Sequence, residues 1–323
     1  MRPPRRPRPV RLLPAVAAVL LLATACGTER AGGDLGGDGV GAASRAPRTP
    51  VTAPPVDGVR VTAVTIPSAP SAPSSTPTPS ASDRIVHADR PADDSGVSAA
   101  YEVTNDGTEA LTYSVLFDFT TSAGEVMSNQ WVTVRDVGAG KTVRGTVEPG
   151  ALAPGASPVT TVKVAEVRKV PAAEAPAQAG VCPSSGIRVT ADDGDAAMGL
   201  RVVGLRLENC GTRDYTLDGY PRLTLLDEDR EPVEGVRILH GGDSITTGTG
   251  LDDPPRAFTL EPGESAVSGL VWRNTTEAGR DPVNVPYVRI RAQSGAAPVT
   301  ITPRLDLGTT GRLGVGAWKP AER

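Results

Sequence analysis

Apolar and polar residues alternate along short stretches of the chain between residues 84 and 170. Every second residue is apolar in 97–103 and again in 113–119, and the turn sequence Asn105-Asp106-Gly107 stands between the two runs. A period of two is typical of half-buried β-strands, and frequent turn signals between such runs are typical of antiparallel sandwiches. The pattern therefore predicts a β-sandwich over residues 84–170.

A second region of the same kind begins at residue 180, after a linker at 171–179 rich in Ala, Pro and Glu. Apolar residues gather in 200–207, 223–226 and 258–260, and each run leads into turn residues. We therefore predict a second sandwich over residues 180–323. The expected fold class is all-β, with two antiparallel immunoglobulin-like β-sandwich domains.

The two domains repeat two short elements in the same order. Asn105-Asp106-Gly107-Thr108 aligns with Asn209-Cys210-Gly211-Thr212, and Val137-Gly138-Ala139-Gly140 aligns with Leu260-Glu261-Pro262-Gly263. The first Asn and the last Gly are 35 positions apart in the first copy and 54 in the second, so the second holds 19 more residues. We place them in the Gly-, Asp- and Thr-rich stretch 236–255, as a long loop of the kind in which such scaffolds usually carry function.

The N-terminal segment has the order of an export signal. Five arginines precede an apolar stretch at 12–25, which is too short to span a bilayer and is interrupted by Pro14. Small residues then lead into Cys26, and this arrangement resembles the bacterial lipoprotein signal. The resemblance implies that residues 1–25 are removed and that Cys26 becomes a lipid-carrying N-terminus. The alternative is an ordinary secretory signal cut near Ala25.

Residues 26–83 are dominated by Gly, Ala, Pro, Ser and Thr. Such a composition does not supply enough apolar surface for a core, so we predict a disordered tether. Within it, residues 59–66 alternate like a strand, and the sequence leaves open whether they form an extra edge strand or nothing.

The charge balance restricts the partners. The whole chain has a formal net charge of −4, and removing residues 1–25 deletes five Arg and no acidic residue, which gives −9. An acidic protein lacks the concentrated basic face that phosphate neutralisation requires, so we expect no nucleic-acid partner. Attachment to the membrane should depend on lipid at Cys26.

The cysteine count is informative because the expected compartment is oxidising. With Cys26 used for the anchor, Cys182 and Cys210 remain as an even pair. One disulfide is the simplest consequence, and two free thiols are the alternative.

The sequence offers only incomplete catalytic sets. Gly242-Asp243-Ser244-Ile245 is similar to the nucleophile block of some esterases, with His240 nearby, but no His follows position 240. A polar loop is the alternative. A cysteine nucleophile at Cys182 or Cys210 would need His87 or His240 as its base. We therefore expect no enzymatic activity and no cofactor.

Two acidic clusters, at 192–195 and 227–229, contain the oxygen ligands that Ca²⁺ prefers, but neither has EF-hand spacing. Asp and Gly also dominate tight turns, so we predict turns there and no metal site.

Aromatic residues make up only 3% of the chain. If several were exposed on one face they would form a sugar-stacking platform, whereas a lone Trp on a sandwich strand is usually core. The residues concerned are Trp131, Trp272, Trp318, Tyr215, Tyr220 and Tyr287.

The second domain is similar to the actinobacterial secreted-protein family catalogued as domain of unknown function 4232. The motif residues that carry this resemblance are Asn209, Gly211, Gly219, Tyr220, Pro221, Pro262 and Gly263, with Cys182 near the start of the domain. The Gly-Tyr-Pro element is the most specific of them. The family usually has a cysteine where Tyr215 stands here. The resemblance implies no known activity.

The first domain resembles, more loosely, the immunoglobulin-like envelope modules of the FxLYD type, through residues 113–119 and Ala123-Gly124. We expect a non-enzymatic protein that lies outside the cytoplasm, is anchored to the cell membrane by lipid at Cys26, and serves interaction or structural support through an envelope or cell-wall partner. The alternative is a binding module for cell-wall glycan or another extracellular ligand.

Overall fold

The computed structural model describes residues 47–67, 95–153 and 155–322. In these ranges the regular elements are β-strands and one short 3₁₀ helix, η1 (Ala172–Glu174). The all-β prediction is confirmed. No helix among the described residues has the length and apolar character needed to cross a membrane.

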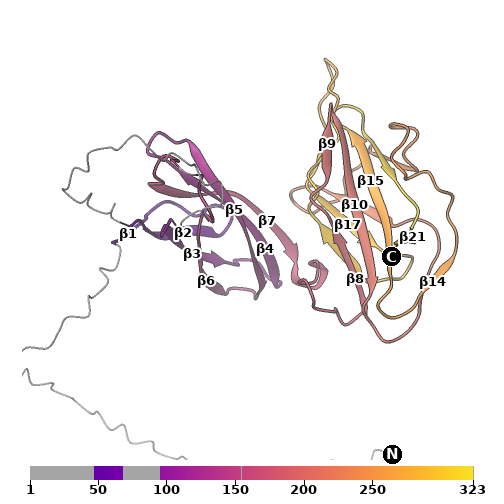
Figure 1. Cartoon of the computed structure of the whole chain (residues 1–323), viewed down its shortest axis with the longest axis horizontal. Coiled ribbons are helices and arrows are strands. Elements are labelled where there is room, and N and C mark those ends of the chain that lie inside the picture. The colour runs from indigo at the N-terminus through magenta and orange to yellow at the C-terminus, as the bar shows by residue number, and fades with distance from the viewer. Residues whose placement is uncertain (1–46, 68–94, 154, 323) are drawn as a thin grey trace, which may run out of the picture. The chain divides into compact units, whose positions relative to one another are not determined.

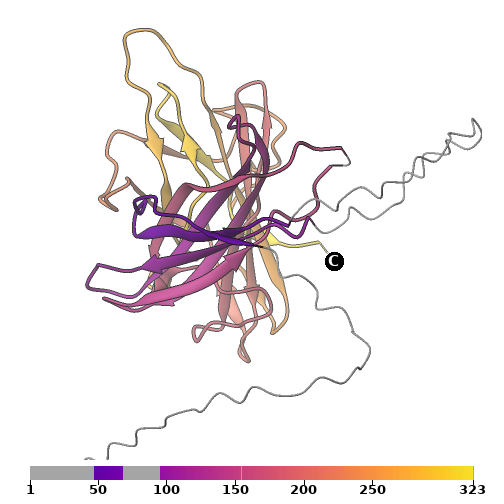
Figure 2. The same cartoon turned by 90° about the vertical axis from the view of Figure 1, so that its left-hand side faces the viewer.

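The N-terminal sandwich consists of two antiparallel sheets, which can be followed by their indigo-to-magenta colour in Figures 1 and 2. One sheet has the order β1(Arg48–Pro50), β2(Val59–Thr65), β3(Ser98–Thr104), β6(Thr142–Val147). The other has the order β5(Val126–Val137), β4(Leu111–Thr120), β7(Thr161–Pro171). The alternating apolar residues of both sheets face one core, where the rings of Tyr101 and Phe117 lie 5.0 Å apart between centroids.

The strand β2 corrects the predicted extent of the tether. It lies between β1 and β3, and its residues Val59, Val61 and Val64 are buried in the core. The prediction of disorder over 26–83 is therefore wrong for this segment, because the alternation of Val59–Thr65 supplies an apolar face despite the surrounding composition. The rest of the predicted tether, apart from residues 47–67, and the signal with Cys26 lie outside the described residues.

The C-terminal sandwich is built around a larger sheet. Its order is β13(Arg237–His240), β20(Arg312–Val315), β15(Ser265–Arg273), β10(Leu200–Asn209), β8(Ile187–Ala191), with β9(Asp195–Ala197) beside β10 and β21(Lys319–Pro320) beside β15. Neighbouring strands are antiparallel except β13 and β20, which are parallel.

Smaller sheets complete this domain. They are β12(Arg222–Leu226), β17(Tyr287–Arg291), β18(Pro298–Ile301); β11(Tyr215–Leu217) with β14(Phe258–Leu260); and β16(Asn284–Val285) with β19(Leu305–Asp306). Leu205 and Trp272 from the large sheet share one core with Ile290 and Leu225 from the β12-β17-β18 sheet. The domain is therefore a sandwich with its own core.

The repeated Asn element has the same hydrogen bonds in both domains. Asn105 donates from Nδ2 to the carbonyls of Glu109 at 2.8 Å and Val137 at 2.7 Å, and its Oδ1 accepts the Gly107 N–H at 2.9 Å. Its backbone carbonyl accepts the Gly140 N–H at 2.7 Å. This buried side chain thus ties the end of β3 to the turn after β5.

Asn209 repeats each of these contacts. Its Nδ2 donates to the carbonyls of Arg213 and Leu260, both at 2.9 Å, its Oδ1 accepts the Gly211 N–H at 3.2 Å, and its carbonyl accepts the Gly263 N–H at 2.7 Å. The sequence alignment of the two elements is confirmed atom by atom, and we call this arrangement the Asn corner.

The two sandwiches belong to one compact unit, Ala46–Arg323. Each has a separate main core, and a small third apolar cluster contains Val170, Leu226 and Tyr287. Arg230 forms an ion pair with Glu109 at 2.7 Å.

Candidate functional site

The Gly-Tyr-Pro element forms a tight turn between β11 and β12. Gly219 has a φ of +85°, a conformation that strongly favours glycine. Its carbonyl accepts the backbone N–H of Trp318 at 2.9 Å, which fastens the turn to the buried C-terminal segment. The backbone at the next residue, Tyr220, is therefore held in place.

The predicted insertion at 236–255 supplies the other side of the site. Its first part forms β13, and its last strand residue is His240, followed by Gly241 with a φ of +84°. The Gly241 N–H donates to the Val315 carbonyl at 2.8 Å, which holds the end of β13 against β20. The insertion is thus partly a strand, where the sequence predicted a loop throughout.

The rings of Tyr220 and His240 stack on each other. Their centroids are 3.9 Å apart and their planes differ by 7°. His240 is exposed and Tyr220 is half-buried. The Gly-Tyr-Pro motif and the insertion are separate elements in the sequence. They are in contact in the structure through the stacked rings of Tyr220 and His240.

The ring pair lies in an open cavity of about 550 Å³, which we call the Tyr220 groove. Its other lining residues include Asp218, Arg222 and Gln293. Neither the Asp218 nor the Arg222 side chain has a hydrogen-bond or ion-pair partner among the described residues. A volume in this range is typical of ligand pockets, which lie between about 300 and 1,000 Å³.

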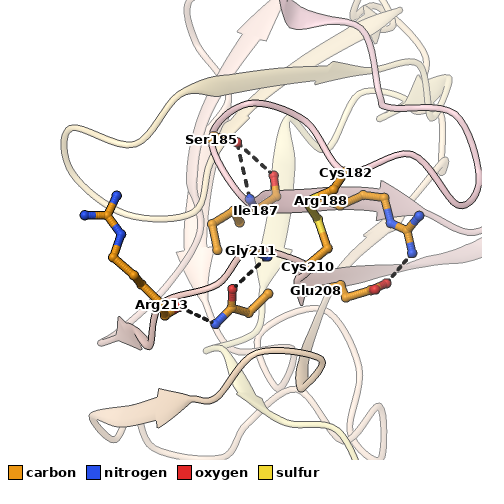
Figure 3. The surroundings of a disulfide bond; sticks show 9 residues. Cys182, Ser185, Ile187, Arg188, Glu208, Cys210, Gly211 and Arg213 are labelled. Carbon is orange, nitrogen blue, oxygen red and sulfur yellow. Dashed lines mark hydrogen bonds and ion pairs between the residues drawn. A yellow bond between two sulfur atoms is a disulfide. The ribbon is translucent and has the colours of Figure 1, made fainter.

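A disulfide joins Cys182 to Cys210, with their Cα atoms 5.7 Å apart (Figure 3). It links the loop before β8 to the residue after β10, next to the register pair Ile187 and Asn209. The predicted pairing is confirmed.

Residues 182–319 match the family model described as Domain of unknown function (DUF4232). The C-terminal domain is similar to that family. The match includes the Tyr220 groove, the Asn corner at Asn209 and both cysteines of the disulfide. No curated protein and no solved structure matched the chain.

The motif residues of this DUF4232-like domain divide into two groups. Asn209, Gly211 and Gly263 take part in the Asn corner. Gly219, Tyr220 and Pro221 line the Tyr220 groove, and Pro262 lies in the turn beside Gly263. The first group explains how the fold is held, and the second marks a surface.

The structure does not assemble the esterase-like arrangement around Ser244. Its side chain makes no hydrogen bond to His240 in the described part of the chain, and His240 stacks on Tyr220 instead. Asp252 orders the loop, because its Oδ1 accepts the N–H groups of Gly242 at 2.6 Å and Asp243 at 2.8 Å. The nearby Asp252 carboxylate also raises the pKa of Asp243.

The cysteine nucleophiles considered in the sequence are both consumed by the disulfide. His87, one of their proposed bases, lies outside the described residues.

The aspartates of both acidic clusters accept hydrogen bonds from nearby backbone N–H groups. Asp192 accepts the N–H groups of Gly194 at 3.0 Å and Gly204 at 2.8 Å, and Asp227 accepts that of Glu231 at 2.9 Å. The turn prediction is confirmed for 227–229. It is wrong for 192–195, because residues 192–194 connect β8 and β9 along the same partner strand β10, and Asp195 is the first residue of β9. The described residues contain no group of three or more His, Cys, Asp or Glu that could hold a metal ion.

The aromatic residues do not form one platform. Trp272 and Trp318 are buried, and their indole N–H groups donate to Asp306 at 2.8 Å and to the Ala292 carbonyl at 2.9 Å. Tyr287 is buried as well, and Tyr215 is half-buried in the core.

Trp131 is 45% exposed, on the outer face of β5. The guanidinium groups of Arg168 and Arg304 lie 4.5 and 5.6 Å from its ring centroid, so the chain itself already provides cation–π partners. Tyr215 and Tyr287 line smaller cavities. Tyr220 lines a larger open groove, and no cation lies over its ring among the described residues.

Proposed function

We propose that the protein is a non-enzymatic interaction module of the cell envelope, exported, anchored by lipid at Cys26, and in contact with its partner through the Tyr220 groove. The observation that carries this proposal is the meeting of the family motif and the inserted strand β13 in that groove. In this proposal the protein is a secreted actinobacterial lipoprotein whose first module is immunoglobulin-like.

The geometry supports a binding role over catalysis. Both cysteines of the domain are in a disulfide, and Ser244 is not hydrogen-bonded to His240. A general base must come within hydrogen-bond reach of the group it activates, and His240 stacks on Tyr220 instead. The net charge of −9 after removal of the signal argues against a nucleic-acid partner.

Lipid attachment has a direct test. A fatty-acid probe fed to growing cells should label the wild-type protein and should not label Cys26→Ser. The double variant Cys182→Ser/Cys210→Ser is the matched control and should keep its label. Equal labelling of the wild type and Cys26→Ser would show that the anchor is elsewhere or that the protein is secreted.

The contact surface can be tested on intact cells with a photo-crosslinking residue. Position 238 lines the groove and is 40% exposed, and position 126 on β5 is a control that is 50% exposed. We expect a discrete crosslinked species from position 238 and none from position 126. Identical products from both positions, or none from 238, would contradict the proposed contact surface.

A second candidate function is favoured by one observation. The stacked rings of Tyr220 and His240 provide an aromatic surface beside free polar groups, which suits a cell-wall glycan.

A further inference from the structure

We propose that the Tyr220–His240 pair is the stacking surface of a site for a neutral saccharide. This inference rests on the proposed role of the Tyr220 groove as the contact surface, and it adds the chemical class of the ligand.

The ring pair is the first requirement of such a site. Because the two rings are nearly parallel and 3.9 Å apart, each covers one face of the other. The exposed imidazole of His240 leaves part of this surface open to the groove. The C–H groups on one face of a sugar ring pack well on an aromatic surface, which is apolar but carries negative charge density on its face.

Polar groups with free hydrogen-bonding capacity are the second requirement. Asp218 offers a carboxylate and Arg222 a guanidinium to the same cavity, and neither has a partner among the described residues. A sugar hydroxyl both donates and accepts, so an acceptor and a donor in one groove can bind neighbouring hydroxyls.

The charge balance of the groove selects among ligands. Asp218 and Arg222 carry opposite charges, so the groove presents neither a cationic nor an anionic surface to a ligand. A polyanion or a basic peptide would meet one repulsive group, whereas a neutral saccharide would meet none. The inference is therefore for a neutral sugar.

The exposed Trp131 provides a contrast in the same chain. Its ring already has Arg168 and Arg304 as cation–π partners, so a sugar would have to compete with them. No such cation lies over the Tyr220–His240 pair among the described residues. Trp131→Ala is therefore a suitable control for the loss of an exposed aromatic residue.

The test uses the full chain with Cys26→Ser, which removes the proposed lipid attachment. Titration calorimetry then measures binding of short oligosaccharides of N-acetylglucosamine, mannose, galactose and arabinose. We expect saturable binding of at least one of them. His240→Ala and Tyr220→Ala should weaken it by about tenfold or more, the size expected for loss of an aromatic stacking contact.

Three variants keep the test specific. His240→Phe and Tyr220→Phe retain a ring and should retain binding, and Trp131→Ala should not change it. Thermal unfolding of each variant checks its folding, and His240→Ala alters an exposed side chain, so its result stands even if Tyr220→Ala is destabilised.

The outcomes separate this inference from the proposed function. No binding at millimolar sugar, or binding unaffected by both alanine variants, overturns the saccharide site. If position 238 then still crosslinks to a protein in cells, the groove remains the contact surface and only the ligand class is wrong. If neither occurs, both proposals fail.

Discussion

Asn209→Ala is expected to lower the free energy of unfolding of the C-terminal domain by about 3 kcal/mol. The side chain is buried and hydrogen-bonds three backbone groups, of Arg213, Leu260 and Gly211. Alanine would leave all three without their partner, and each unsatisfied buried group costs about 1 to 3 kcal/mol.

The repeated corner supplies a second test of the same argument. Asn105→Ala removes the equivalent bonds in the first domain and should destabilise that domain by a similar amount. Hydrogen exchange read by mass spectrometry can assign each loss to its own domain. Asn284→Ala, an exposed position in the C-terminal domain, is the control and should change little. A loss under about 1 kcal/mol in both Asn variants would show that the corner is not a stabilising element.

The repeat of the Asn-x-Gly-Thr elements and the later glycines could be read from the sequence, because each element is short and recurs in the same order. The hydrogen bonds of the Asn corner could not be predicted from it, because Asn105 bonds to Val137 and Asn209 bonds to Leu260, which are distant in the sequence. Segment 59–65 was harder, because its surroundings have the composition of a tether. Only pairing with β1 and β3 decides that it is a strand, and β3 is separated from it by about thirty residues of sequence.

The candidate site was only partly predictable for the same reason. The Gly-Tyr-Pro element and the insertion were both marked in the sequence, but their meeting depends on the parallel pairing of β13 with β20. No local pattern encodes a contact between residues 240 and 315. The sequence therefore indicates His240 only as a candidate base, and it carries no signal for the stacking of His240 on Tyr220.

The exposure of the tryptophans shows the limit of strand alternation. Val134 on β5 faces the core of the N-terminal sandwich. Trp131 is three residues earlier, so the period of two places it on the opposite, outer face, as found. On β15 both faces are covered, and Leu270, Val271 and Trp272 are all buried in succession. Leu251 of the insertion packs close to Gly269 on this strand, a contact that alternation alone does not predict.

The double variant Cys182→Ser/Cys210→Ser is expected to destabilise the C-terminal domain by about 3 to 4 kcal/mol. The disulfide joins residues 28 positions apart, and closing a loop of this length restricts the unfolded chain by about that amount. Replacing both cysteines avoids the free thiol that a single variant would leave. Since the bond lies outside the first domain's core, that domain should keep its stability.

Denaturant unfolding, monitored by hydrogen exchange, measures the loss of stability in each domain separately. Cys182 is exposed, so reduction of the wild type should be feasible without prior unfolding and should give the same destabilisation as the double variant. Alkylation of the folded, unreduced protein should find neither thiol free. Two reactive thiols would disprove the bond, and a loss confined to the first domain would contradict its assignment to the start of the second. A shift shared by both domains would instead show that the small cluster of Val170, Leu226 and Tyr287 couples their unfolding.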